Sequence, residues 1–112
     1  MGDRVLRCVA DGIVKGFLRK SDFVARFGGD EFAVVLRETA LKDALMLGER
    51  LVARIRALRV PAGEGTVNVS VSVGVAGIVL GDTVTTWFER ADRGLYAAKG
   101  AGRDRVAAAD RA

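Results

Sequence analysis

Two consecutive glycines, Gly28 and Gly29, separate the strand-like runs 22–27 and 31–36. Glycine adopts positive φ freely, so a glycine pair between two such runs predicts a tight β-hairpin turn. A glycine turn also leaves the backbone bare, which lets a large ligand come close. The hairpin therefore predicts both antiparallel strand pairing and a place where a ligand can reach the main chain.

Two acidic residues, Asp30 and Glu31, follow the glycines at the lip of this turn. Hard oxygen ligands beside an open glycine turn suit a divalent metal that carries a triphosphate. The alternative is a hairpin whose acidic tip is simply solvated. The four residues alone leave both interpretations open.

Helical and strand-like patterns alternate along the rest of the chain. Apolar residues recur at helical spacing over 3–18, 41–58 and 83–98. The valine- and serine-rich run 67–79 predicts one long strand, after a break at 61–65. The residues expected to face inward on the third helix are Trp87, Phe88, Ala91, Leu95 and Ala98. This order predicts an α+β fold in which helices cover an antiparallel sheet.

Composition narrows the function classes. At 112 residues the chain forms one domain at most, and its net charge is +4. Because no basic run interleaves with aromatic residues, we expect no nucleic-acid partner. No apolar run approaches the ~20 residues of a membrane helix, so we expect no membrane segment. A single cysteine and the absence of histidine exclude an intrachain disulfide and His/Cys zinc sites.

Four blocks together resemble one known family. The segment 26–32, Arg-Phe-Gly-Gly-Asp-Glu-Phe, resembles the signature of the GGDEF family of diguanylate cyclases, which join two GTP into cyclic di-GMP. The block 91–105 is similar to the family's C-terminal helix with its Lys-x-x-Gly-Arg turn. The Ser-x-Gly strand is matched by 69–76, and the Gly-Asp-x-Val-Leu that opens a helix is matched by 2–7. The resemblance implies a ferredoxin-like, nucleotidyl-cyclase palm-like α+β fold.

The resemblance also assigns roles at the cyclase site. It implies that Asp30 is a metal ligand and that Glu31 assists the metal or the attacking 3′-hydroxyl, with Mg²⁺ or Mn²⁺ as the cofactor. Gly28 and Gly29 would lie under the phosphates or ribose. Asp3 matches a position that accepts hydrogen bonds from guanine, although it is also a plausible helix N-cap.

Two cations complete the site that the resemblance implies. Lys99 and Arg103 match positions that reach the β- and γ-phosphates of GTP, where charge-assisted hydrogen bonds are strong. The alternative is that both simply complement the dipole at a helix C-terminus.

A second site is implied by the segment 19–22, which spells Arg-x-x-Asp. In the family, this spacing before the glycines marks a product-inhibition site, so Arg19 and Asp22 are expected to bind cyclic di-GMP. The resemblance further implies bacterial signalling in the cytoplasm, GTP as substrate, and a homodimer that joins two half-sites.

The family pattern contains segments that we do not find in this sequence. A first helix and a strand with Asp-x-Asp-x-Phe-Lys would precede Gly2. We therefore expect 1–106 to be a partial GGDEF domain without its central first strand, and 107–112 to be a frayed tail. Because a missing central strand leaves a gap of about 9.6 Å and unpaired backbone groups, we expect this chain alone to be unstable and nearly inactive.

Three hypotheses follow for the function. The first is a diguanylate cyclase domain. The second is a non-catalytic module that binds cyclic di-GMP through Arg19 and Asp22. The third is a fragment whose function resides only in a longer protein.

Overall fold

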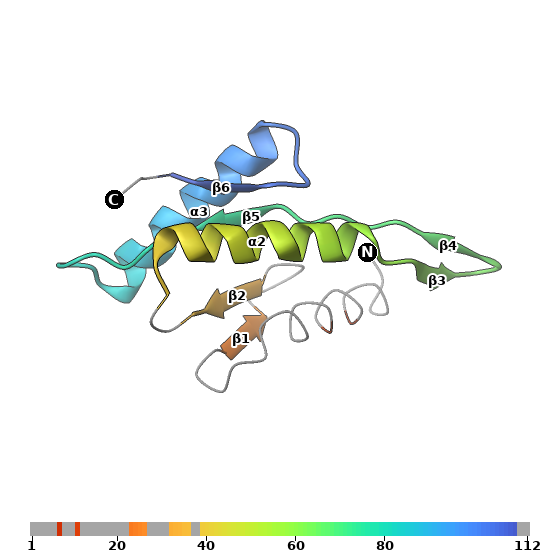
Figure 1. Ribbon diagram of the computed structural model, residues 1–112, viewed down its shortest axis with the longest axis horizontal. Helices are drawn as coiled ribbons and strands as arrows, with labels where there is room; N and C mark the ends of the chain where they lie inside the picture. The colour runs from red at the N-terminus through yellow and green to blue at the C-terminus, as the bar shows by residue number, and fades with distance from the viewer. Residues whose placement is uncertain (1–6, 8–10, 12–22, 27–31, 37–38, 110–112) are drawn as a thin grey trace.

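The computed structural model describes residues 7, 11, 23–26, 32–36 and 39–109. These residues form an α+β arrangement, as the sequence predicted (Figure 1). The elements are β1 (Phe23–Arg26), β2 (Phe32–Val35), α2 (Leu41–Arg56), β3 (Val60–Ala62), β4 (Gly65–Val67), β5 (Val73–Val75), α3 (Val84–Gly100) and β6 (Val106–Ala108). Of the helix expected over 3–18, only Arg7 and Asp11 are described, and both are helical.

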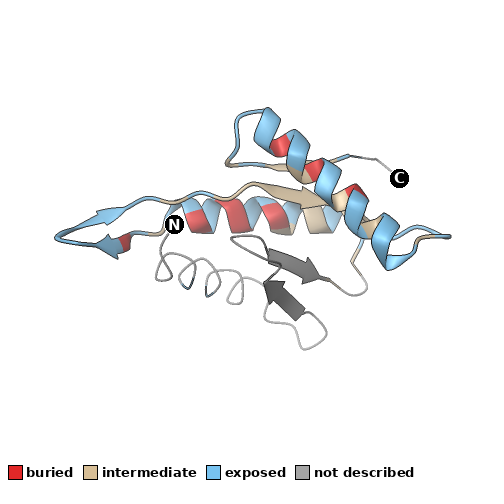
Figure 2. Cartoon of the chain, turned by 180° about the vertical axis from the view of Figure 1, so that it is seen from behind, coloured by how far each residue is buried: buried red, intermediate tan, exposed pale blue. Residues whose placement is uncertain are grey.

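The strands β5 and β6 pair in parallel, and they lie between the two helices. Val73 pairs with Val106 and Gly74 with Ala107. A Cβ placed on Gly48 of α2 would lie 3.2 Å from the Val106 methyls and 3.6 Å from Val73. Successive strand residues point to opposite faces, so Val73 meets α2 while Gly74 meets α3. Figures 1 and 2 accordingly show α2 and α3 on opposite sides of β5.

The core lies mainly between α2 and the segment leading into β5. Leu51 and Ile55 are buried on one stripe of α2, and the valines Val69, Val71 and Val73 pack against them. Figure 2 shows the buried residues confined to the inward stripes of the two helices and to one residue of β3. The buried residues of α2 are Gly48, Leu51, Val52 and Ile55, and they recur at the helical spacing that predicted a helix over 41–58.

Helix α3 approaches the strands closely because two glycines lie at the contact. A Cβ on Gly74 would overlap the Ala91 carbonyl oxygen and the Leu95 nitrogen, and a Cβ on Gly94 would lie 2.7 Å from the Ala107 carbonyl oxygen. The buried face of α3 consists of Arg90, Gly94 and Ala98. Phe88, which the sequence placed inward, is instead 39% exposed.

The expectation of one strand over 67–79 is wrong. The run begins in β4, which pairs with β3, and resumes as a strand only at β5. β5 pairs with β6 over three residues, Val73–Val75 opposite Val106–Ala108. The described strands form three two-stranded sheets, of which two are antiparallel and one is parallel.

The segment expected to break the chain, 61–65, forms a hairpin instead. β3 and β4 are antiparallel and joined by Gly63 and Glu64, and Gly63 has the positive φ of 61° that such a short turn requires. This hairpin projects from one end of the molecule (Figure 1).

The hairpin predicted around the two glycines is confirmed by its strands. β1 pairs antiparallel with β2, in a register that runs from Phe23 opposite Val35 to Arg26 opposite Phe32. The last short strand, expected at 105–106, is present as β6. Ala107 and Ala108, assigned from sequence to a frayed end, pair with Gly74 and Val75.

Candidate functional site

The described part of the candidate site is the end of α3 and the turn that follows it, residues 99–105. The family resemblance implies that this segment binds phosphate, so we name it the phosphate turn. The helix that leads into this turn, α3, has a well-defined start. The Thr83 hydroxyl accepts a hydrogen bond from the Thr86 amide at 3.1 Å, and the Thr86 hydroxyl accepts one from the Thr83 amide at 2.9 Å. This reciprocal capping box satisfies two amides that would otherwise lack helical partners.

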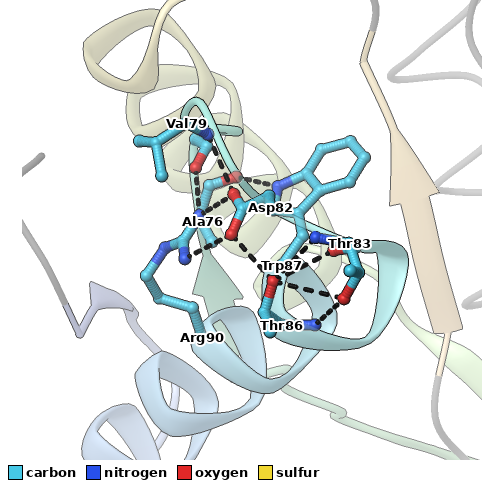
Figure 3. Close-up of polar contacts among 8 residues, drawn as sticks. Ala76, Val79, Asp82, Thr83, Thr86, Trp87 and Arg90 are labelled. Atoms are coloured by element: carbon cyan, nitrogen blue, oxygen red, sulfur yellow. Dashed lines mark hydrogen bonds and ion pairs between the residues drawn. The ribbon is translucent and has the colours of Figure 1, made fainter.

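The loop before α3 is held by a buried ion pair (Figure 3). Arg90 is only 9% exposed, and it donates hydrogen bonds to Asp82 at 3.0 Å and to the Gly77 carbonyl oxygen at 2.7 Å. Asp82 also accepts a hydrogen bond from the Val79 amide at 2.9 Å. The hydrogen bond from Arg90, followed by that from Val79, holds the pKa of Asp82 well below its usual range.

Trp87 adds a further contact to this loop, because its indole Nε1 donates to the Ala76 carbonyl oxygen at 2.8 Å. The network therefore fixes the first half of α3 against the segment that leaves β5. Sequence reasoning missed Arg90 and Asp82. A charged residue on the inward stripe of an amphipathic helix was the available signal.

The other end of α3 closes with a left-handed turn. The Arg103 amide donates to the Ala98 carbonyl oxygen at 2.9 Å, and the Gly102 amide donates to the Lys99 carbonyl oxygen at 3.3 Å. This pairing resembles a Schellman motif, in which glycine supplies the positive φ, here 126° at Gly102. The chain thereby reverses at the helix end and enters β6.

Lys99 and Arg103 consequently stand at the same end of α3, Lys99 in its last turn and Arg103 just beyond it. Both residues are exposed, and neither side chain makes a hydrogen bond or ion pair with another described residue. Two cations without local partners at a helix end can bind an anion, and they also complement the helix dipole. Their placement fits both interpretations made from the sequence.

The remaining predicted site residues lie outside the described residues. These are Asp3, Arg19, Asp22, Gly28, Gly29, Asp30 and Glu31. The structure describes the two strands that flank 27–31, so the glycines and carboxylates belong to the connection between β1 and β2. Among the described residues, no group of three or more acidic, cysteine or histidine side chains is arranged to hold a metal ion.

The sequence belongs to a known family. The family model for "Diguanylate cyclase, GGDEF domain" matches residues 1–105 of this chain. Diguanylate cyclase DgcP of Pseudomonas aeruginosa is 42% identical over 105 residues, which cover 94% of this chain and 16% of that protein. The response regulator PleD of Caulobacter vibrioides is 38% identical over 109 residues, which cover 95% of this chain and 24% of that protein. This chain is therefore a member of the GGDEF diguanylate cyclase family.

Solved structures agree with this assignment. The GGDEF domain of DgcB from Caulobacter crescentus, in complex with c-di-GMP, superposes with a TM-score of 0.90 at 32% identity, covering 96% of this chain and 64% of that one. The active GGEEF domain of a diguanylate cyclase from Vibrio cholerae gives a TM-score of 0.86 at 29% identity, covering 98% and 69%. The chain spans about a sixth to a quarter of the length of the two curated relatives named above.

Neither α2 nor α3 is long and apolar enough to cross a bilayer.

Proposed function

We propose that this chain acts in the synthesis of cyclic di-GMP, binding GTP and contributing one half-site of a diguanylate cyclase. Family membership supports the reaction class. The observation that carries the proposal is the phosphate turn, which presents Lys99 and Arg103 together at the end of a helix with no described partner for either cation.

The phosphate turn suits the leaving group of this reaction. Arg103 has a planar fork that can take two phosphate oxygens at once, while Lys99 provides a compact point charge. In the proposed complex the two side chains hold the β- and γ-phosphates of GTP. They stabilise the charge that gathers on pyrophosphate as the bond from the α-phosphorus to the bridging oxygen breaks.

The connection between β1 and β2 supplies the other half of the chemistry. Asp30 and Glu31 are hard carboxylates of the kind that hold Mg²⁺ or Mn²⁺, so the donor chemistry fits a divalent metal. Such a cation neutralises phosphate charge and makes a 3′-hydroxyl more acidic. The 3′-oxygen of one GTP then attacks the α-phosphorus of the other, and Glu31 assists its deprotonation. Gly28 and Gly29 leave room for the ribose and phosphates.

Two further parts of the proposal concern guanine and the product. Asp3 would accept the adjacent N1–H and N2–H₂ donors of guanine. Because two GTP molecules are joined, the half-sites of two copies would face each other in a homodimer. Arg19 and Asp22 would bind cyclic di-GMP as an inhibitor.

The direct test measures cyclic di-GMP formed from GTP with Mg²⁺ or Mn²⁺ by mass spectrometry, together with GTP binding by calorimetry. Replacing Arg103 or Lys99 with alanine should lower GTP affinity about 10- to 100-fold, the range expected for a hydrogen bond to a charged group. Arg54→Ala and Lys42→Ala are matched controls. Both residues are exposed on α2, and each substitution removes one positive charge, as Arg103→Ala and Lys99→Ala do. Equal effects in all four variants would show that only general positive charge matters.

The receptor alternative gives a different result. A chain that binds cyclic di-GMP, loses that binding in Arg19→Ala and does not bind GTP would be a receptor. If the chain binds neither GTP nor cyclic di-GMP, both the cyclase function and the receptor function are refuted for this polypeptide.

A further inference from the structure

The phosphate turn contains an unusual run of backbone conformations. Gly102, Arg103 and Asp104 have φ values of 126°, 64° and 53°. Arg103 and Asp104 are the two non-glycine residues with positive φ among those described. A side chain in this region costs conformational free energy, and such strain persists where surrounding contacts fix the backbone. The contacts that fix this turn therefore also fix the direction in which Arg103 leaves the main chain.

Asp104 makes contacts on two sides of the turn. Its carboxylate Oδ2 accepts a hydrogen bond from Arg56 Nε at 2.8 Å, and its carbonyl oxygen accepts one from Arg56 Nη2 at 3.4 Å. Its amide donates to Ser72 Oγ at 3.2 Å. Asp104 thus ties the turn to the last residue of α2 and to the residue before β5.

The hydrogen bonds of the neighbouring residues hold other parts of the chain. The Arg105 carbonyl oxygen accepts a hydrogen bond from the Val73 amide at 2.9 Å, but this bond anchors the start of β6. The Arg103 amide is bonded back to Ala98, which anchors the end of α3. Between these two anchors, Arg105 Nε donates to the Arg103 carbonyl oxygen at 3.1 Å within the turn itself, whereas Arg56 holds the Asp104 carboxylate from another element, α2.

The surroundings of the two Asp104 carboxylate oxygens indicate a geometric role. Oδ1 is buried and has no hydrogen-bond partner among the described residues, while Oδ2 is held by Arg56. The ion pair is partly exposed, with 56% of the Arg56 and 35% of the Asp104 side chain accessible, so solvent screens its charge interaction. Its main effect is therefore on the shape of the turn.

We propose that Asp104, held by Arg56, is a positioning residue that orients Arg103 toward the β- and γ-phosphates of GTP. This inference rests on the proposed function of Arg103 as a phosphate contact. The Arg103 side chain makes no hydrogen bond or ion pair with another described residue, so its direction follows from the backbone that Asp104 helps to hold.

The test compares affinities for GTP and GMP, measured by calorimetry on the whole chain with Mg²⁺. GMP lacks the β- and γ-phosphates, so its binding is a reference for folding and for the guanine contacts. Asp104→Gly keeps the left-handed backbone accessible but removes the carboxylate, and Arg56→Ala removes its partner from an exposed helix end. Asp104→Asn keeps an oxygen acceptor and also tolerates positive φ.

We expect Asp104→Gly and Arg56→Ala each to lower the affinity for GTP about tenfold, as loss of a well-directed charged hydrogen bond would, with GMP affinity unchanged. Asp104→Asn should restore most of the GTP affinity, and Arg54→Ala should match the wild type. The Asp104→Gly and Arg56→Ala double variant should be no weaker than either single variant, because both remove one contact.

Three results would overturn the inference. Equal losses of GTP and GMP affinity would indicate a purely structural role for Asp104. An unchanged GTP-to-GMP ratio in Asp104→Gly and Arg56→Ala, with a reduced ratio in Arg103→Ala, would refute the positioning role and leave the phosphate contact intact. An unchanged ratio in Arg103→Ala, or absence of GTP binding by the wild type, would refute the proposed function and this inference together.

Discussion

Replacing Gly74 with alanine should push helix α3 away from β5. A Cβ at this position overlaps the Ala91 carbonyl oxygen and the Leu95 nitrogen and lies 2.8 Å from Leu95 Cα, whereas ordinary contact begins near 3.4 Å. All three obstacles are backbone atoms of one helix, so no rotamer change can relieve them. The helix as a whole must move by more than the 0.6 Å missing at Leu95 Cα, because the Ala91 oxygen and the Leu95 nitrogen lie closer still to the Cβ position.

The cost of that movement follows from what α3 covers. Gly94 and Ala98 are buried residues of this helix. A Cβ placed on Gly94 would lie 2.7 Å from the Ala107 carbonyl oxygen, so the helix is close to β6 as well. Overpacking typically costs 1–3 kcal/mol, and because the clash is entirely with backbone we expect about 3 kcal/mol or more. This is a large share of the ~5–15 kcal/mol that stabilises a typical domain.

Urea unfolding followed by circular dichroism measures the effect. With an m value of about 1–2 kcal/mol/M for a domain of this size, a loss of 3 kcal/mol lowers the midpoint by about 1.5–3 M. Gly65→Ala is the matched control, because Gly65 also lies in a strand, has no positive φ and has nothing within 4 Å of its Cβ position. A Gly74→Ala midpoint equal to that of Gly65→Ala would refute the close-packing argument.

Three further predictions concern the loop that precedes α3. Thr83→Ala should destabilise the chain by about 1 kcal/mol, since it removes the N-cap, and a thermal melt with no change would contradict the capping role. Trp87→Phe should lower the free energy of unfolding by about 1 kcal/mol, because it removes the hydrogen bond from the indole to the Ala76 carbonyl oxygen. Equal urea midpoints for the variant and the wild type would show that this hydrogen bond does not stabilise the fold. Because the folded pKa of Asp82 is lowered, its ionisation stabilises the fold above its usual pKa of 3.8 and this stabilisation is lost as the pH falls below that value. The difference in free energy of unfolding between the wild type and Asp82→Asn should therefore shrink in acid. A difference that stays constant from pH 7 to pH 3 would contradict this stabilising role of the Asp82 carboxylate.

Periodicity predicted the helices because their stripes are long and regular. The expected 41–58 and 83–98 became Leu41–Arg56 and Val84–Gly100. The strands were harder, because a strand depends on a partner elsewhere in the chain. The run 67–79 has uniform composition, yet it is divided by two different partners, β3 and β6.

The inward face of α3 shows a second limit of sequence reasoning. Apolar periodicity favours Phe88, but the buried positions include Gly94 and Arg90. Glycine has a low helix propensity, so its role at a close contact is recognised only when the strand backbone packed against it is known. Arginine reads as a surface residue until its partner, Asp82 in the preceding loop, is seen.

For the candidate site, motif resemblance predicted a phosphate-binding role for Lys99 and Arg103. The structure places both residues at one helix end, and the role itself stays a prediction. The resemblance gave no role to Asp104 or Arg56, because their contact joins residues 48 positions apart. The roles of Asp30, Glu31 and the Arg19–Asp22 site remain predictions, since these residues lie outside the described part of the chain.

The contacts also separate two ways in which a substitution can weaken the phosphate turn. The turn lies between the end of α3 and the start of β6, and both of those elements are fixed by the packing at Gly74 and Gly94. We therefore expect a change at Gly74 to move the whole helix end, and to reduce stability together with the proposed GTP binding. A change at Asp104 or Arg56 removes a contact outside that interface, so under our proposal we expect it to alter the direction of Arg103 alone. Stability and the GTP-to-GMP affinity ratio should consequently fall together for Gly74→Ala, but only the ratio should fall for Arg56→Ala.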